Sequence, residues 1–273
     1  MQDDLDLPAN IERFTGFAHC YDAHRPEPPP VLAEILTRRA QVERPDLVVD
    51  LGSGTGLSTI YWAERAEGVV GIEPSPDMRR QAEARTAALP AARNVRYQDG
   101  LSTATGLPDG CADIVTCSQS LHWMEPEPTF AEVARILRPG GVFAAYDCDW
   151  PPTMNWEAEA AYLETTRRAE LIGAERGFFA GVRRWEKKEH LARLRGSHRF
   201  RYVKEILLHS IDTGNAERLV GLCRSQGSIA TLLKRGVPEA EIGLDALQHV
   251  AERALGTGTV PWHWSYRVRI ALR

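Results

Sequence analysis

Between residues 46 and 147, short apolar runs alternate with helical segments, and this alternation limits the folds that the chain can adopt. Helical patterns stand between the first three runs and before the last. Strands that alternate with helices form a mainly parallel sheet covered by helices on both faces. We therefore expect an α/β fold with a ligand crevice at the carboxyl ends of the strands. The expected strands are DLVVDL (46–51), GVVGIE (68–73), NVRYQD (94–99), ADIVTCS (112–118) and GVFAAYD (141–147).

The first expected strand continues into a turn that carries Gly52, Gly54 and Gly56. Nucleoside triphosphates, dinucleotides and S-adenosylmethionine are all bound by glycine turns between a strand and a helix. The triphosphate loop requires a lysine followed by Ser or Thr, and residues 48–62 contain no lysine. The dinucleotide pattern requires its third glycine at Leu57, so Gly56 comes one residue early. The first of these ligands is excluded, and the second fits imperfectly.

Asp50 distinguishes between the two remaining ligand classes, because it stands at the end of the strand just before the glycines. A carboxylate there would repel a pyrophosphate. The ammonium group of S-adenosylmethionine, in contrast, would be a hydrogen-bonded partner for it. The glycines lack Cβ atoms, so we expect the backbone to bend sharply and to approach the cofactor closely. Charge therefore favours S-adenosylmethionine.

The next two expected strands end in residues that suit an adenosine. Glu73 follows the glycine turn by about 20 residues. An acid at this position can accept hydrogen bonds from both ribose hydroxyls, and this holds for NAD as well. Asp99 can accept a hydrogen bond from the adenine amino group, while Gly100 leaves room for the ring and Leu101 follows. The alternative is that Asp50 and Asp99 only cap turns.

In their order and positions, these motifs resemble the class I S-adenosylmethionine-dependent methyltransferases with a type 11 methyltransferase domain. The resemblance covers residues 8–150 and implies a Rossmann-like, seven-stranded, mostly parallel sheet with helices on both faces and a helical cap insertion. Segments 17–30 and 118–130 are similar to the trans-aconitate methyltransferase branch. The motifs that carry the resemblance are DLGSGTG (50–56), GIEPSPDM (71–78), the Asp99–Gly100 pair and LRPGGVFAAYDCDW (137–150).

The resemblance also implies a cofactor site on the motif residues. Its predicted lining is Asp50, Gly52, Gly54, Gly56, Glu73, Pro74, Met78, Asp99, Gly100, Leu101 and Ser118. It further suggests that the segment before the sheet folds over the cofactor. We predict that Tyr21 closes the site and acts in catalysis, and that Arg25 pairs with the methionine carboxylate or a substrate acid. An ordinary surface arginine is the alternative for Arg25.

Methyl transfer requires a base only when the acceptor carries a proton at neutral pH. His122, at the end of the fourth expected strand, is the candidate general base because its ordinary pKa lies near neutrality. The alternative is that His122 packs beside Trp123 and orients the loop. An acceptor carboxylate would need no base.

After residue 150 the sequence becomes helix-rich and charged, and strand patterns return only at 199–211 and 262–272. In the last segment Tyr266, Val268 and Ile270 share one face and two arginines the other, as in a half-covered antiparallel strand. We divide the chain into an N-terminal helical segment that closes over the cofactor (1–45), a cofactor-binding core (46–150), a helical cap insertion (151–198) and a C-terminal part that completes the sheet (199–273).

Charge and composition limit the kinds of partner that the protein can bind. The chain has 33 basic and 37 acidic side chains, so its formal charge of −4 gives little field for binding nucleic acid. No apolar run approaches the length of a membrane span, the first residues lack the pattern of a secretory signal, and the five cysteines form no CxxC pair. We expect a cytoplasmic monomer or homodimer without a bound metal or a membrane partner.

The predicted function is transfer of a methyl group from S-adenosylmethionine to an oxygen, in a carboxylate or hydroxyl, of a small-molecule acceptor. S-adenosylhomocysteine is the second product. Methylation at carbon, nitrogen or sulfur stays open, as does a non-catalytic protein that binds S-adenosylmethionine. An NAD-dependent oxidoreductase would keep Glu73 but should carry the dinucleotide pattern and lack Asp50.

Overall fold

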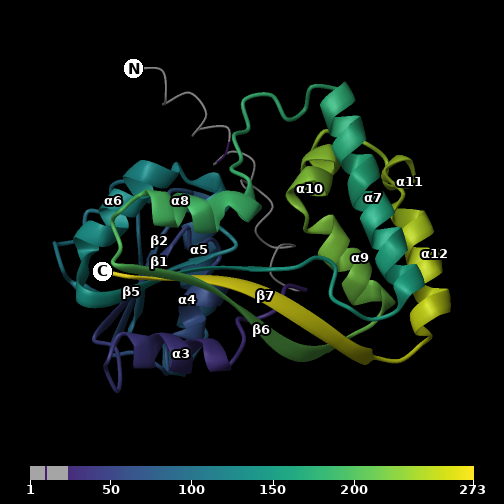
Figure 1. Ribbon diagram of the computed structural model, residues 1–273. Coiled ribbons are helices and arrows are strands. Elements are labelled where there is room, and N and C mark those ends of the chain that lie inside the picture. The colour runs from purple at the N-terminus through teal and green to yellow at the C-terminus, as the bar shows by residue number, and fades with distance from the viewer. Residues whose placement is uncertain (1–9, 11–23) are drawn as a thin grey trace. The chain divides into compact units, whose positions relative to one another are not determined.

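The computed structural model describes residue 10 and residues 24–273 (Figure 1). Its single seven-stranded sheet has the strand order β3-β2-β1-β4-β5-β7-β6. The strands β1 to β5 pair in parallel, and β7 pairs antiparallel with β5. The predicted Rossmann-like α/β fold is therefore confirmed. The strands are β1 (Leu47–Leu51), β2 (Gly68–Ile72), β3 (Val95–Gln98), β4 (Ala112–Ser118), β5 (Leu137–Cys148), β6 (Tyr202–Gly214) and β7 (Val260–Leu272).

The chain divides into two compact units. The sheet unit consists of residues 27–148, 183–208 and 266–273. Its helices are α3 (Val31–Arg39), α4 (Leu57–Tyr61), α5 (Pro76–Ala87), α6 (Pro126–Ile136) and α8 (His190–Gly196), with short 3₁₀ helices at Pro90–Ala92, Leu121–Trp123 and Lys187–Glu189.

The described residues of the helical unit are 10, 24–26, 149–182 and 209–265. Its helices are α7 (Trp156–Glu175), α9 (Ala216–Arg224), α10 (Gly227–Lys234), α11 (Glu239–Ile242) and α12 (Leu244–Leu255). The division differs from the segment 151–198 that the sequence suggests, because α8 belongs to the sheet unit. Among the helices of residues 24–273, none is long and apolar enough to cross a bilayer.

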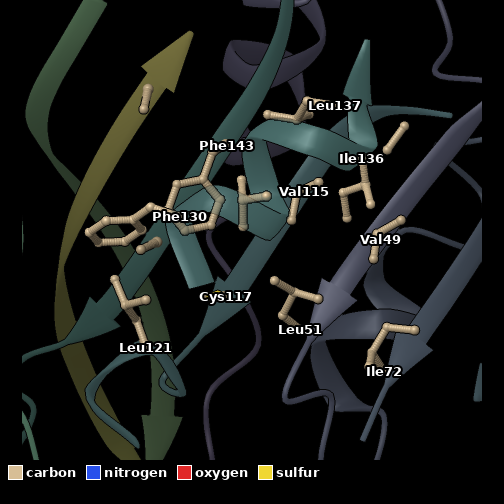
Figure 2. Packing of buried hydrophobic residues seen from close by; sticks show 14 of the residues in the cluster. Val49, Leu51, Ile72, Val115, Cys117, Leu121, Phe130, Ile136, Leu137 and Phe143 are labelled. Carbon is tan, nitrogen blue, oxygen red and sulfur yellow. The ribbon is translucent and has the colours of Figure 1, made fainter. Parts of the chain in front are cut away.

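The strands β1, β4 and β5 are buried on both faces, and their two faces pack on different helices. Val49, Val115 and Phe143 lie in the cluster that Figure 2 shows, together with residues of α6. There the rings of Phe130 and Phe143 are 6.4 Å apart. Figure 1 shows α3 on the side of the sheet opposite α6 and α8. Burial on both faces explains why these strands read as continuous apolar runs.

Candidate active site

The glycine turn after β1 is tied to its neighbour β2 by backbone hydrogen bonds. The amide groups of Gly52 and Ser53 both donate to the carbonyl of Ile72, at 2.8 and 3.1 Å. The other side of the turn is closed by Ser120, whose hydroxyl donates to the carbonyl of Leu51 at 2.8 Å. The turn is thus fixed between the carboxyl ends of β2 and β4.

Gly52, Gly54 and Gly56 all have left-handed backbone conformations, with φ of 64°, 55° and 83°. A Cβ on Gly52 would lie 2.8 Å from the side chain of Ser120, and one on Gly56 would lie 2.2 Å from the hydroxyl of Tyr97. A Cβ on Gly54 would have no atom within 4 Å. Only Gly54 therefore faces open space where a ligand can approach. The sequence analysis expected all three glycines to let the backbone approach the cofactor. At Gly52 and Gly56, packing against other residues of the protein already requires glycine.

Glu73 joins the glycine turn to the turn after β2. Its Oε2 accepts from the amide of Gly54 and its Oε1 from the amide of Ser75, both at 2.9 Å. Burial raises the pKa of this carboxyl, while the two backbone donors act in the opposite direction. Glu73 is 8% exposed, so the structure holds a buried acid beside the open face of Gly54.

Asp50 is buried beneath the turn, with 1% of its surface exposed. Its two carboxylate oxygens accept from the hydroxyls of Thr59 on α4 and Thr116 on β4, both at 2.8 Å. The register of the sheet explains the second contact, because Asp50 and Thr116 are paired residues of β1 and β4. Burial raises the pKa of Asp50 to about 6. Its predicted contact with the ammonium group of S-adenosylmethionine stays a prediction.

Asp99 follows β3, and its side chain is 76% exposed. Arg79 of α5 lies 2.6 Å from its Oδ1 and also donates to the carbonyl of Glu73. Gly100 is confined, since a Cβ there would be 3.0 Å from Ile72. Of the other predicted lining residues near this edge, Met78 is buried in α5, whereas Pro74 and Leu101 are half-buried.

Ser118 ends β4 and is paired in register with Tyr146 of β5. Tyr146 is 1% exposed, and its hydroxyl is hydrogen-bonded to that of Ser58 on α4. Burial raises the pKa of Tyr146 well above its usual value, so the phenol is neutral. Thr59, Thr116 and Tyr146 form a polar layer under the turn that the sequence analysis missed. The apolar pattern of the strands gave no sign of it.

His122 lies in the 3₁₀ helix Leu121–Trp123 after β4 and is 6% exposed. Its ring centre is 4.6 Å from that of Trp123, as the packing alternative expects. Its Nδ1 is 3.9 Å from Oδ1 of Asp147, a buried acid near the end of β5. The sequence analysis did not single out Asp147. Since parallel strands end at the same edge, His122 shares that edge with the glycine turn.

Two predicted site residues do not belong to the described part of the sheet unit. Tyr21 lies outside the described residues, so its role stays a prediction. Arg25 belongs to the helical unit, where its Nη2 donates to the carbonyl of Ser225 at 3.0 Å. Its guanidinium lies 5.3 Å from the ring centre of Trp150. A contact of Arg25 with the cofactor also stays a prediction.

The turn has the groups that an adenosine cofactor with an amino acid end requires. The buried hydroxyl of Ser53 has no hydrogen-bond partner among the residues that the structure describes. Gly54, which faces open space, is the next residue in the chain, and the carboxylate of Glu73 lies at the same turn. An unsatisfied buried hydroxyl, a face without a side chain and a buried acid fit a polar ligand. The fold and these groups define a Rossmann-like domain for a cofactor of this kind.

Comparison with known proteins indicates the class of enzyme. Residues 49–145 match the family model of the methyltransferase domain. The chain is 37% identical over 130 residues to an uncharacterized methyltransferase of Mycobacterium tuberculosis, which covers 47% of this chain and 49% of the relative. It is 29% identical over 130 residues to a provisionally assigned methyltransferase of Dictyostelium discoideum, covering 48% and 46%. The chain thus spans about half the length of the curated relatives it matches.

Solved structures agree in fold over most of the chain. A provisionally assigned type II methyltransferase from Anaeromyxobacter dehalogenans has a TM-score of 0.62 at 22% identity, over 92% of this chain and 97% of the other. The YcgJ protein from Bacillus subtilis has a TM-score of 0.53 at 16% identity, over 88% and 97%. The match over residues 49–145 is to a methyltransferase domain, a family that uses S-adenosylmethionine, and the solved structures agree with it in fold.

A glutamine in place of Glu73 is expected to weaken the binding of S-adenosylhomocysteine by roughly 10- to 100-fold. The reason is the loss of charge-assisted hydrogen bonds to the ribose, worth about 1–3 kcal/mol. Isothermal titration calorimetry measures the effect, with Glu83→Gln as the control because Glu83 is an exposed acid of α5. An unchanged dissociation constant for Glu73→Gln would mean that the ribose is held elsewhere.

Proposed function

We propose that this protein transfers the methyl group of S-adenosylmethionine to an oxygen of a small-molecule acceptor, a hydroxyl or a carboxylate. S-adenosylhomocysteine is released. The observation that supports the proposal best is the glycine turn: Gly54 faces open space, its amide donates to the carboxylate of Glu73, and the hydroxyl of the preceding Ser53 has no partner among the described residues. His122 lies at the same edge of the sheet and supplies a group for acceptor chemistry.

Bound S-adenosylmethionine supplies a methyl carbon that its sulfonium already activates. The protein therefore acts mainly by positioning the two reactants and by keeping water out. Glu73 holds the ribose, Asp50 the ammonium group, and Gly54 allows the backbone to approach. A hydroxyl acceptor must lose its proton, and His122 removes it; an acceptor carboxylate is already ionised at neutral pH.

The similarity of segments 17–30 and 118–130 to the trans-aconitate methyltransferase branch supports a small organic acid as the acceptor. In that case the methyl ester is the product, and His122 only orients the loop. The buried position of His122 near Asp147 supports a hydroxyl instead, since a carboxylate needs no base. The product itself distinguishes these two acceptors.

Two measurements test the proposal. Calorimetric titrations with S-adenosylhomocysteine and, separately, with NAD should show binding of the first alone. Incubation with a trideuteromethyl donor and a panel of acids, alcohols, phenols, amines and thiols should then give one product that carries the label, identified by mass spectrometry. Binding of NAD, or of neither ligand, would contradict the cofactor assignment. Cofactor binding without any labelled product would favour a non-catalytic binding protein.

A further inference from the structure

Several charged side chains converge on one carboxylate near the carboxyl end of β5, all within the sheet unit. Asp147, whose side chain is 8% exposed, accepts from Nζ of Lys187 at 2.7 Å on Oδ1 and from Nη1 of Arg269 at 2.8 Å on Oδ2. Oδ1 also lies 3.9 Å from Nδ1 of His122. Arg269 in turn donates from Nε to Glu205 of β6 at 2.9 Å.

The local structure holds these groups in place. Arg269 is paired in register with Ala145 of β5, two residues before Asp147, so both charged side chains lie on the same face of the sheet. Nζ of Lys187 lies 3.2 Å from Oε1 of Gln119, whose φ of 55° is unusual for a residue with a side chain. The amide of Trp185 donates to the carbonyl of His122 at 2.8 Å and fixes the segment before Lys187 to the histidine.

We propose that Asp147 is a positioning residue for His122 in methyl transfer to a hydroxyl, an inference that rests on the proposed function. Nδ1 of His122 faces the carboxylate and carries its proton there, and Nε2 is then the nitrogen that accepts the proton of the acceptor. The acceptor hydroxyl gives its proton to Nε2, and its oxygen takes up the methyl group, whose bond to the donor sulfur breaks with the electron pair left on sulfur. Asp147 then stabilises the imidazolium.

The separation of 3.9 Å is too long for a hydrogen bond, and the contact between Asp147 and His122 is electrostatic. Distances of this kind commonly shorten when the substrate binds. Opposite charges within about 4–6 Å already favour the charged form of a histidine. The orientation of Nδ1 toward Oδ1 and the burial of both side chains are therefore the parts of the geometry that matter.

The charges around His122 explain why a carboxylate is needed there. Lys187 and Arg269 oppose a third positive charge at the imidazole, and Asp147 contacts both cations and lies 3.9 Å from the ring nitrogen. Farther out, Arg184 lies 5.9 Å from the ring centre of Trp123, and Glu205 is paired with Arg269. His190 of α8 adds no charge at neutral pH, because burial lowers its pKa to about 4.

The test is a proton NMR titration of His122 in the full-length protein, with the resonance assigned through His122→Gln. Asp147→Asn is expected to lower the midpoint of the titration by about one pH unit or more, because two cations then lack their shared anion. Lys187→Gln is expected to raise it, because removing the cation strengthens the effect of Asp147 on the ring. Opposite shifts from two neighbouring residues are not expected of a merely structural role.

Asp113→Asn is the matched control. Asp113 is a buried aspartate that accepts from Nε of Arg138 at 2.6 Å, but it lies at the opposite end of the sheet, near the start of β4. The midpoint for His122 should stay as in the unchanged protein. Equal midpoints in Asp147→Asn and the unchanged protein would overturn the proposal. If Asp147→Asn does not fold, the absence of a rise in Lys187→Gln overturns it equally.

Activity gives an independent measurement once a hydroxyl acceptor is known. In Asp147→Asn, kcat should fall by about 10- to 100-fold because a general base contributes about 10²- to 10⁴-fold and is only partly lost. The acidic limb of the profile of kcat/KM against pH should move to lower pH. The titration with S-adenosylhomocysteine tests the proposed function separately, because failure to bind would leave the NMR result for Asp147 unaffected.

Discussion

An asparagine in place of Asp50 is expected to make the protein more stable at neutral pH and, at the same time, a weaker binder of S-adenosylmethionine. Burial raises the pKa of Asp50 to about 6, from an ordinary value of 3.8. A carboxyl with a raised pKa in the folded state contributes stability that is fully present below about pH 4 and lost as the pH rises through about 6. At pH 7 the buried charge therefore opposes folding, by an amount on the order of 3 kcal/mol.

The amide of Asp50→Asn removes that charge but can still exchange hydrogen bonds with Thr59 and Thr116. We expect the free energy of unfolding at pH 7 to rise by about 1–2 kcal/mol, and its decrease between pH 4 and 6 to become smaller. Affinity for the cofactor should fall by roughly 10- to 100-fold, because the ammonium group loses a charged partner. Urea denaturation at several pH values and calorimetry measure the two effects.

Asp113→Asn serves as a control here also, since Asp113 is a buried aspartate with an arginine partner and two backbone donors. It is expected to lower stability instead, because the asparagine breaks that ion pair. Were Asp50→Asn to bind the cofactor as tightly as the unchanged protein, Asp50 would be a structural residue that only links α4 to β4.

Two alanine substitutions in the glycine turn are expected to separate binding from folding. Both Gly54→Ala and Gly56→Ala place a side chain in a left-handed conformation, which costs about 1–2 kcal/mol. At Gly54 the added methyl group has open space, so the protein should fold. The methyl group would nevertheless occupy the space of the cofactor, and affinity for S-adenosylhomocysteine should fall at least about tenfold, which corresponds to about 1.4 kcal/mol.

Gly56→Ala should instead reduce stability severely. Its methyl group would lie 2.2 Å from the hydroxyl of Tyr97, which is hydrogen-bonded to Thr86 at 2.9 Å. Tyr97 must move, and strain together with overpacking should cost about 2–5 kcal/mol. Thermal denaturation followed by circular dichroism, together with calorimetry, measures both variants. Normal affinity in Gly54→Ala would show that the cofactor does not pass over this glycine.

The sheet and its carboxyl edge were predictable from the sequence because they depend on local patterns. Apolar runs of strand length mark β1, β2 and β4, and an acid at or just after the ends of β1, β2 and β3 marks the carboxyl edge. Such signals need no knowledge of contacts between distant residues. The same reasoning found Asp50 and Glu73, which lie where the strand order brings β1 and β2 together.

Residues that form long-range pairs were not predictable in this way. The alternating pattern of β7 suggested that Arg269 faces solvent, but it is 2% exposed. It is buried because Asp147 and Glu205, far away in the sequence, neutralise its charge. In a sequence, a polar residue that is buried with a partner cannot be told from a surface residue unless that partner is known.

The double attachment of the glycine turn to Ile72 has a consequence for dynamics. The amide hydrogens of Gly52 and Ser53 are both bonded to a carbonyl of β2, which has a strand on either side, and not to another loop residue. They should exchange with solvent deuterium only when β2 itself opens, and therefore as slowly as amides of the core. A turn that is ordered before its ligand arrives loses little conformational entropy on binding, so more of the contact energy appears as affinity.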